Sequence, residues 1–254
     1  MPLVRQLLFI IGALTSSCIF GQIPKHLFNE NTGETYNPKD FTSKTKLINQ
    51  RAGIYHFGES EGEWDFIILQ NGDSLIVQIW YGIWGTNYFT KKETWLSQCK
   101  TFNKVTVQGN KIFFEKFSGL FAEYKAENKI TKALLLFCDP IEDRSYGKDS
   151  AEVGHFNYLS SVNNFYKFKS DTSYYQLSTA VQQENYFIGK TKQELRLMRN
   201  TIYAQYGLIF QAGGEIEKYF KAKDWYNPLQ KDVSNCLTEI EAKNIQTIAR
   251  LEQQ

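Results

Sequence analysis

Histidine, methionine, cysteine and proline are scarce in this chain of 254 residues, with 3, 2, 4 and 5 copies. The histidines, His26, His56 and His155, lie far apart, and none stands in a recognisable nucleophile motif. The cysteine spacings match no zinc ligand set, and the acidic residues lack the spacing of an EF-hand loop. We therefore expect no metal, no cofactor and no catalytic histidine.

Neither sign of charge dominates, because 29 Lys and Arg residues stand against 27 Asp and Glu residues, a net charge of +2. A protein that binds nucleic acid needs a concentrated basic face, which this balance does not indicate. A phosphate-binding glycine loop is also missing, since Gly213-Gly214 follows no predicted strand and carries no Lys-Ser/Thr partner. We expect no nucleic-acid partner.

Long apolar runs are absent apart from a short one near the amino terminus. Arg5 precedes the apolar run Leu7 to Leu14, and small polar residues follow through Ser17. The run is shorter than the ~20 residues that span a bilayer, and its order is typical of a secretory signal peptide. We predict that residues 1–21 are removed after Gly21. The mature protein is then secreted, periplasmic or in the cell envelope, with no transmembrane segment.

The four cysteines leave two questions open. Lipid attachment at Cys18 is an alternative to cleavage, although Thr15 stands where bacterial lipoprotein signals carry an aliphatic residue. Beyond the leader, Cys99 and Cys138 form a disulfide if their strands lie side by side. The alternative is that these two and Cys236 are three buried free thiols.

Strand patterns fill residues 46–170, after a polar lead-in segment of residues 22–45. Asn71-Gly72 separates two apolar runs and predicts a hairpin with a type I′ turn. That turn pairs Ile68 with Leu75, Phe66 with Val77 and Trp64 with Ile79, which form a buried apolar face. The opposite face carries Asp65, Ile67, Leu69, Ser74, Ile76 and Gln78, and we expect it to be at best half covered.

Gly109-Asn110 predicts a second hairpin, in which Val107 faces Ile112 and Val105 faces Phe114. Further strand candidates are Gly53 to Phe57, Phe121 to Lys125, Ala133 to Cys138 and Phe165 to Phe168. Six to eight sequential strands with short turns predict an antiparallel β-meander. We expect a barrel-like or strongly curved sheet, lipocalin-like by analogy.

Helical patterns replace strand patterns at the carboxyl end, after a polar linker of residues 171–185. Residues 186–254 show apolar positions with a period near 3.6. Three helices are expected: one opened by the capping box Thr191–Glu194, one over Glu215 to Lys221, and one opened by the capping box Thr238–Glu241. The fold class is therefore α+β, with a β-rich domain followed by a small three-helix domain.

The helical residues also carry a family resemblance. The landmarks are Leu195-Arg196-Leu197-Met198-Arg199-Asn200, Ile202-Tyr203-Ala204-Gln205-Tyr206-Gly207, Phe210, Tyr219-Phe220, Trp225-Tyr226-Asn227-Pro228, Leu237-Thr238-Glu239-Ile240-Glu241 and Asn244-Ile245. In this order they resemble the signature of the YARHG domain, over about residues 186–254. The resemblance implies an extracellular bacterial module that is attached to varied partner domains and has no established activity. The family's Arg-His pair is Gln205-Tyr206 here, so no charged or titrating role is carried over to it.

Two groups of residues are candidates for ligand binding. The aromatic stretch in the β-rich domain supplies Trp80, Tyr81, Trp84 and Tyr88, whose rings either stack against sugar faces or fill a β core. The helical domain supplies Arg199, Asn200, Tyr203 and Trp225, which either line a glycan or peptide groove or tie the helices together.

These patterns favour a non-enzymatic bacterial envelope or extracellular protein of unknown ligand. The β-rich domain would bind the ligand, and the YARHG-like domain would attach to a cell-envelope glycan or protein partner. The alternative is an envelope hydrolase that uses dispersed carboxylates, with Asp139, Glu142 and Asp143 as candidates.

Overall fold

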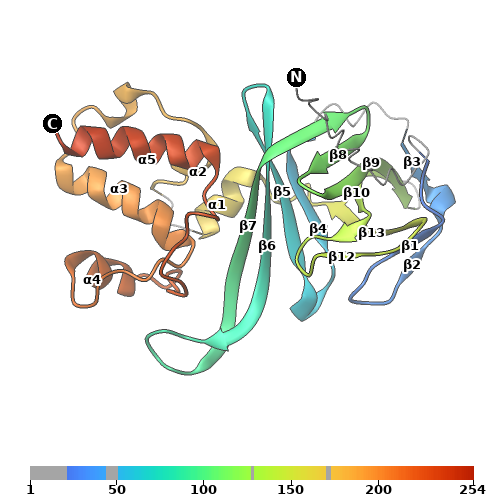
Figure 1. Ribbon diagram of the computed structural model, residues 1–254, viewed down its shortest axis with the longest axis horizontal. Coiled ribbons are helices and arrows are strands. Elements are labelled where there is room, and N and C mark those ends of the chain that lie inside the picture. Colours follow the sequence, from blue (N-terminus) through green and yellow to red (C-terminus); the bar gives the residue numbers. More distant parts are fainter. Residues whose placement is uncertain (1–21, 44–50, 127–128, 170–172) are drawn as a thin grey trace, which may run out of the picture.

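The computed structural model describes residues 22–43, 51–126, 129–169 and 173–254. The predicted signal peptide, with Cys18, lies outside the described residues. Figure 1 shows a strongly curved sheet beside a group of helices, which pack together on one side of the sheet.

The sheet closes on itself as a ring. The strands are β1 (His26–Phe28), β2 (Thr35–Tyr36), β3 (Phe41–Thr42), β4 (Gly53–Phe57), β5 (Trp64–Asn71), β6 (Ser74–Thr86), β7 (Glu93–Gln108), β8 (Lys111–Phe114), β9 (Phe117–Ala126), β10 (Lys129–Leu136), β11 (Cys138–Asp139), β12 (Arg144–Ser145) and β13 (Ser150–Phe156). Strands β4 to β10 follow one another as antiparallel neighbours, and β13 closes the ring because it pairs with both β10 and β4. This arrangement confirms the predicted curved, barrel-like sheet.

Short strands from the predicted lead-in segment extend this ring. β1 pairs in parallel with β13, β2 pairs with β1, and β3 pairs with β9. The sheet is therefore mixed at one edge, while the ring itself is antiparallel. Residues 22–43 thus belong to the β architecture.

Helices dominate the carboxyl-terminal part, as predicted. They are α1 (Val162–Lys169), α2 (Gln176–Thr179), α3 (Lys192–Gln205), α4 (Glu215–Lys221) and α5 (Glu239–Glu252), with the short 3-10 helices η1 (Pro38–Asp40), η3 (Ser60–Gly62) and η4 (Glu184–Phe187). Capping boxes open α3 at Thr191 and α5 at Thr238, which confirms both helix starts. The α+β class is confirmed.

The predicted strand over Phe165 to Phe168 is wrong, because these residues lie in the helix α1. Tyr166 is fully buried while Phe168 is exposed. In a strand these two residues would share a face, whereas in a helix they point in different directions. An apolar run this short does not distinguish the two periods.

The β5–β6 hairpin forms, but its register differs from the prediction by two residues. Phe66 pairs with Ile79 rather than with Val77. The loop consists of Gly72 and Asp73, and Gly72 has φ of 59°, which suits the first position of a type II′ turn. Because an even shift keeps each side chain on its face, the predicted buried face is unchanged.

The β7–β8 hairpin has the predicted register, with Val107 opposite Ile112. Gly109 stands at the turn with φ of 59°. Glycine at the first turn position tolerates a positive φ. This local signal was sufficient to predict the pairing of β7 with β8.

The interior of the ring is a packed aromatic and aliphatic core. Its buried members are Tyr55, Phe57, Trp64, Phe66, Ile68, Val77, Ile79, Phe102, Ile112, Phe114, Phe117, Phe121, Leu134 and Leu136. Gly154 makes room for one of these rings, because a Cβ there would lie 2.2 Å from Cε2 of Phe57. Functional groups are therefore to be sought on the outside of the ring.

The prediction of a half-covered outer face is wrong, because the helices bury it. Ile67, Leu69 and Ile76 are fully or almost fully buried in one core with Met198 and Ile248 from the helices. Figure 1 shows the helices beside this part of the sheet. The two parts of the chain share this core, so the helical part does not depend on its own small core.

A polar network is buried where the sheet meets the helices. Gln78 of β6 donates from Nε2 to the Tyr206 hydroxyl at 2.9 Å, and the Tyr166 hydroxyl donates to Oε1 of Gln78. The Tyr206 hydroxyl donates to the Glu241 carboxylate at 2.9 Å, and Gln205 donates to the same carboxylate at 2.5 Å. Gln205 and Tyr206, which replace the family's Arg-His pair, therefore act here as neutral partners of a buried carboxyl group.

Cys99 and Cys138 do not form a disulfide in the structure. Cys99 belongs to the core between the sheet and the helices, whereas Cys138 packs against the core inside the ring. Their strands are not neighbours in the sheet, because β7 pairs with β6 and β8 while β11 pairs with β12.

Candidate functional site

A pair of exposed tryptophans is the first candidate site. Trp84 of β6 and Trp95 of β7 are direct cross-strand neighbours. Their side chains contact each other edge to face, with ring centroids 5.5 Å apart. Trp84 is 56% exposed and Trp95 is 39% exposed. Buried tryptophans stabilise cores, but a contacting pair with this much exposure offers flat apolar surface to a ligand.

The tryptophan pair is held in place by its neighbours. Trp95 lies over Gly82, where a Cβ would come within 2.0 Å of the indole. Trp84 donates from Nε1 to a Glu61 carboxylate oxygen at 3.5 Å. A glycine on one side and a carboxylate on the other thus orient the two rings. The carboxylate also places a hydrogen-bond acceptor at the edge of the apolar surface.

The hairpin that carries the pair is fixed at its far end. In Figure 1 the β6–β7 hairpin extends beyond the rest of the sheet, and its loop approaches α4. In that loop Asn87 donates from Nδ2 to Oδ1 of Asn227 at 3.0 Å. Phe89 packs near Tyr226, with ring centroids 6.0 Å apart, and Lys221 lies over its ring. Both ends of the ribbon are therefore held, so the tryptophans stand on a rigid support.

A groove in the helical part is the second candidate site. It has a volume of about 210 Å³ and is lined by residues of α3, the following loop and the start of α4: Arg196, Arg199, Asn200, Phe210, Gln211, Gly214, Glu215, Ile216 and Glu217. Arg199 already makes a bidentate ion pair with Glu252, at 2.8 and 2.9 Å. Two of its donors are therefore occupied, and the groove combines paired charges with an aromatic ring.

The structure separates the predicted site residues. Arg199 and Asn200 line the groove, and Trp84 is on the exposed hairpin. Trp80 is buried and stacks on Tyr206, and Tyr81 packs beside the core inside the ring. Tyr88 lies under Lys91 in the hairpin loop. Tyr203 packs against the core that the sheet and the helices share, and Trp225 packs against Phe220.

Residues that the predicted site lacks are Trp95, Glu61 and Phe210. Trp95 follows the predicted aromatic residues along the chain, and its contact with Trp84 depends on the register of the β6–β7 hairpin. Glu61 comes from η3 and Phe210 from the loop after α3. Their positions follow from packing between distant segments, so no local pattern indicates them.

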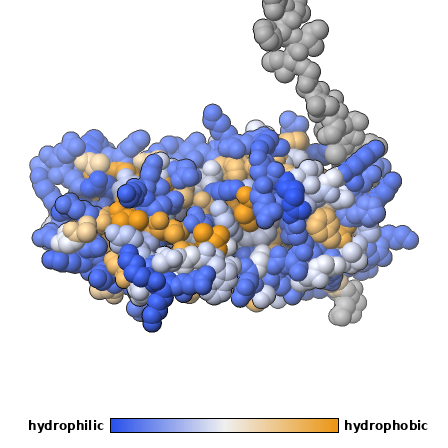
Figure 2. Space-filling view, turned by 60° about the horizontal axis from the view of Figure 1, so that its bottom comes forward, coloured by the Kyte–Doolittle hydropathy of each residue, from blue (hydrophilic) through white to orange (hydrophobic). Residues whose placement is uncertain are grey.

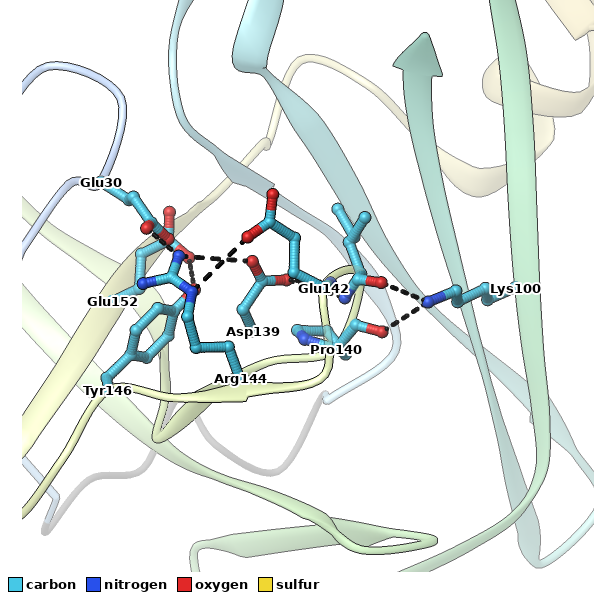
Figure 3. Close-up of polar contacts among 9 residues, drawn as sticks. Glu30, Lys100, Asp139, Pro140, Glu142, Arg144, Tyr146 and Glu152 are labelled. Atoms are coloured by element: carbon cyan, nitrogen blue, oxygen red, sulfur yellow. Dashed lines mark hydrogen bonds and ion pairs between the residues drawn. The ribbon is translucent and has the colours of Figure 1, made fainter.

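Two of the three carboxylates proposed for the alternative hydrolase, those of Asp139 and Glu142, lie beside Arg144 (Figure 3). Asp139 accepts the backbone N–H groups of Ile141 and Glu142, at 2.7 and 3.1 Å. Arg144 lies among Glu30, Asp139 and Glu142, and it forms ion pairs with all three. These contacts give the acidic residues a structural role, because Asp side chains commonly accept hydrogen bonds from backbone N–H groups in turns.

Asp143, in the same turn, pairs with Lys116. Lys100 reaches the turn from β7 and donates to the Pro140 carbonyl at 3.0 Å. Arg144 and Lys100 therefore hold the two sides of the turn, as Figure 3 shows.

Glu152 is the most unusual carboxyl group beside this turn. It is buried on β13, and the Tyr146 hydroxyl donates to it at 2.6 Å. Burial raises its pKa to about 7, helped by the nearby charges of Glu30 and Asp139. A carboxyl group that titrates near neutrality is suited to proton transfer, but it also occurs in purely structural networks.

Comparison with known families decides what the helical part is. Residues 170–253 match the family model of the YARHG domain. This part of the chain is a YARHG domain. Its carboxyl-terminal position confirms the resemblance in the sequence, and the match begins before residue 186, so that it includes α2 and η4. No curated protein and no solved structure matches the chain.

The YARHG domain is typical of extracellular or periplasmic proteins. Within the described residues, no helix combines the length and apolar character needed to cross a membrane. The groove beside Arg199 lies within the YARHG domain, while the tryptophan pair lies on the preceding sheet. The two candidate sites therefore belong to different parts of the chain.

On the face shown in Figure 2, apolar residues form a broken band among polar ones. Large exposed apolar side chains of the described chain include Ile83, Trp84, Trp95, Ile130, Tyr158, Leu159, Phe168 and Ile188. Scattered apolar residues of this kind are ordinary on protein surfaces. The contact between Trp84 and Trp95 makes that pair the better candidate for a ligand.

Proposed function

We propose that this is an exported, non-enzymatic binding protein that holds a cell-envelope glycan on the tryptophan pair. The YARHG domain serves in attachment or interaction at the cell surface. One observation carries the proposal: two indole rings stand in contact and exposed on a ribbon that is fixed at both ends.

A sugar fits this surface better than a purely apolar ligand. Sugar rings present C–H faces that pack on indoles, and their hydroxyl groups require hydrogen-bond partners beside the rings. Glu61 supplies a carboxylate next to Trp84. Ser97 of β7, the cross-strand partner of Gly82, carries a hydroxyl that accepts a hydrogen bond from Lys169 at 3.0 Å and keeps its own proton for a sugar oxygen. Rigid aromatic anchors also lose little conformational entropy on binding.

The direct test is binding to a glycan array that includes bacterial cell-wall fragments. We expect the intact chain to retain at least one glycan, and Trp84→Ala to weaken that binding by about 30-fold or more, as for a hot-spot residue. Phe168→Ala is the matched control, since Phe168 is an exposed ring on α1. Titration calorimetry with the retained glycan gives both dissociation constants. Equal binding by Trp84→Ala and the parent would refute the proposal, as would a blank array.

An envelope hydrolase is the alternative, and the raised pKa of Glu152 favours it. A carboxyl group with a raised pKa beside a second carboxyl group, here that of Asp139, is an arrangement used in acid–base hydrolysis. If this alternative holds, a screen with cell-wall polysaccharides will show turnover, and Glu152→Gln will reduce it at least 100-fold while leaving glycan binding intact. Lack of turnover in the parent protein would exclude this activity on the substrates screened.

A further inference from the structure

Two cysteines from distant parts of the chain lie side by side between the sheet and the YARHG domain. Cys99 is on β7, and Cys236 precedes α5, 137 positions further along the chain. The Cys236 thiol donates to the Cys99 carbonyl oxygen at 3.4 Å, and both cysteines are free thiols in the structure. Both residues are buried, with 6% and 2% exposure.

The backbone around Cys236 is fixed against the sheet. Its carbonyl oxygen accepts hydrogen bonds from Thr101 at 2.5 Å and from Gln78 at 3.0 Å. The next residue, Leu237, accepts a hydrogen bond from Asn103 at 3.3 Å. Three side chains of β6 and β7 therefore hold the segment that carries Cys236 in place. These contacts keep the Cys236 thiol within hydrogen-bonding distance of the Cys99 backbone.

We propose that Cys99 and Cys236 form a disulfide that joins the sheet to the YARHG domain in the exported protein. The proposal relies on the export that is part of the proposed function, because structural disulfides persist in oxidising compartments. Cys138 is not part of the proposed disulfide, because it packs against the core inside the ring.

The bond forms by exchange with a disulfide-bearing oxidant, either an exported thiol oxidase or oxidised glutathione. One cysteine thiolate attacks the oxidant disulfide, which gives a mixed disulfide and releases one oxidant thiolate. The second cysteine thiolate then attacks the protein sulfur of that mixed disulfide, forms the S–S bond and releases the other oxidant thiolate. The protein loses two electrons and two protons, and the oxidant becomes two thiols. Because both cysteines are buried in the folded chain, the exchange takes place before the YARHG domain packs fully onto β7.

The test uses the chain refolded in glutathione redox buffer, followed by alkylation in denaturant without reductant and peptide mapping. We expect one linked pair of peptides that contain Cys99 and Cys236, with alkylation at Cys138. The mature chain purified from the bacterial periplasm should carry the same link. Thermal denaturation should show a melting temperature higher by about 10 °C in the oxidised form than in the reduced form.

Cys138→Ser should keep the link and the difference in melting temperature, whereas Cys99→Ser and Cys236→Ser should each lose both. Alkylation of all three cysteines after oxidative refolding, or a link to Cys138, would overturn the proposal. A link that forms in glutathione buffer, with the natural protein found reduced in the cytosol, would refute export while leaving the geometry of the pair correct. The two failures are therefore distinguishable.

Discussion

Glu241→Ala is expected to lower the free energy of unfolding by about 3–5 kcal/mol, because several buried donors lose their acceptor at roughly 1–3 kcal/mol each. The Glu241 carboxylate accepts hydrogen bonds from Gln205, Tyr206 and the Thr238 backbone. Its removal leaves these donors buried without an acceptor, and such groups are costly. It also removes the capping box of α5, so the helix start weakens at the same time.

Urea denaturation followed by circular dichroism measures this effect. The matched control is Glu194→Ala, which removes the corresponding residue of the α3 capping box, where the hydrogen bonds are exposed to solvent. We expect a much smaller loss for the control, because water replaces the missing acceptor. Equal losses for the two variants would show that the buried network contributes little beyond the cap.

A rise in pH from about 5 to about 8 is expected to destabilise the protein through Glu241 and Glu152. Burial raises the pKa of each carboxyl group to about 7 in the folded state, above the ordinary value of 4.5. The folded state therefore binds more protons than the unfolded state between these two values, and stability falls as pH rises through this interval. Each group accounts for a change on the order of 3 kcal/mol.

The measurement is the midpoint of urea denaturation at several pH values. Glu241→Gln and Glu152→Gln should each flatten the pH profile, and the double variant should flatten it further. Glu194→Gln should leave the slope between pH 5 and 8 in place, because hydrogen bonds from Thr191 lower the pKa of Glu194. A profile whose slope is unchanged in the double variant would contradict the assignment of these two groups.

Much of the local structure could be predicted from short stretches of residues. The capping boxes at Thr191 and Thr238, the turn at Gly109 and the extent of α4 all agree with the structure. Each of these signals depends on hydrogen bonds or dihedral angles within about four residues. The YARHG resemblance succeeded for a related reason, since many landmarks stand in a fixed order along one continuous segment.

The candidate site was only partly predictable. Trp84 and Arg199 were proposed, and the structure places the first on an exposed surface and the second in a groove. Trp80 belongs to the same aromatic stretch but is buried against Tyr206. Whether a tryptophan on a strand is exposed depends on what covers that face, and here the covering helices come from more than 80 positions further along the chain.

The amino-acid sequence by itself determined the change from strands to helices along the chain, the helix starts at Thr191 and Thr238, and the family of the carboxyl-terminal part. Only the tertiary structure decided that β13 closes the ring, that the helices cover one outer face, and that Cys99 meets Cys236. The physical reason is the range of the interactions. Backbone propensities and caps act between residues that are near one another in the sequence. Ring closure, burial of a face and contact between two thiols depend on the packing of segments that are far apart in the sequence.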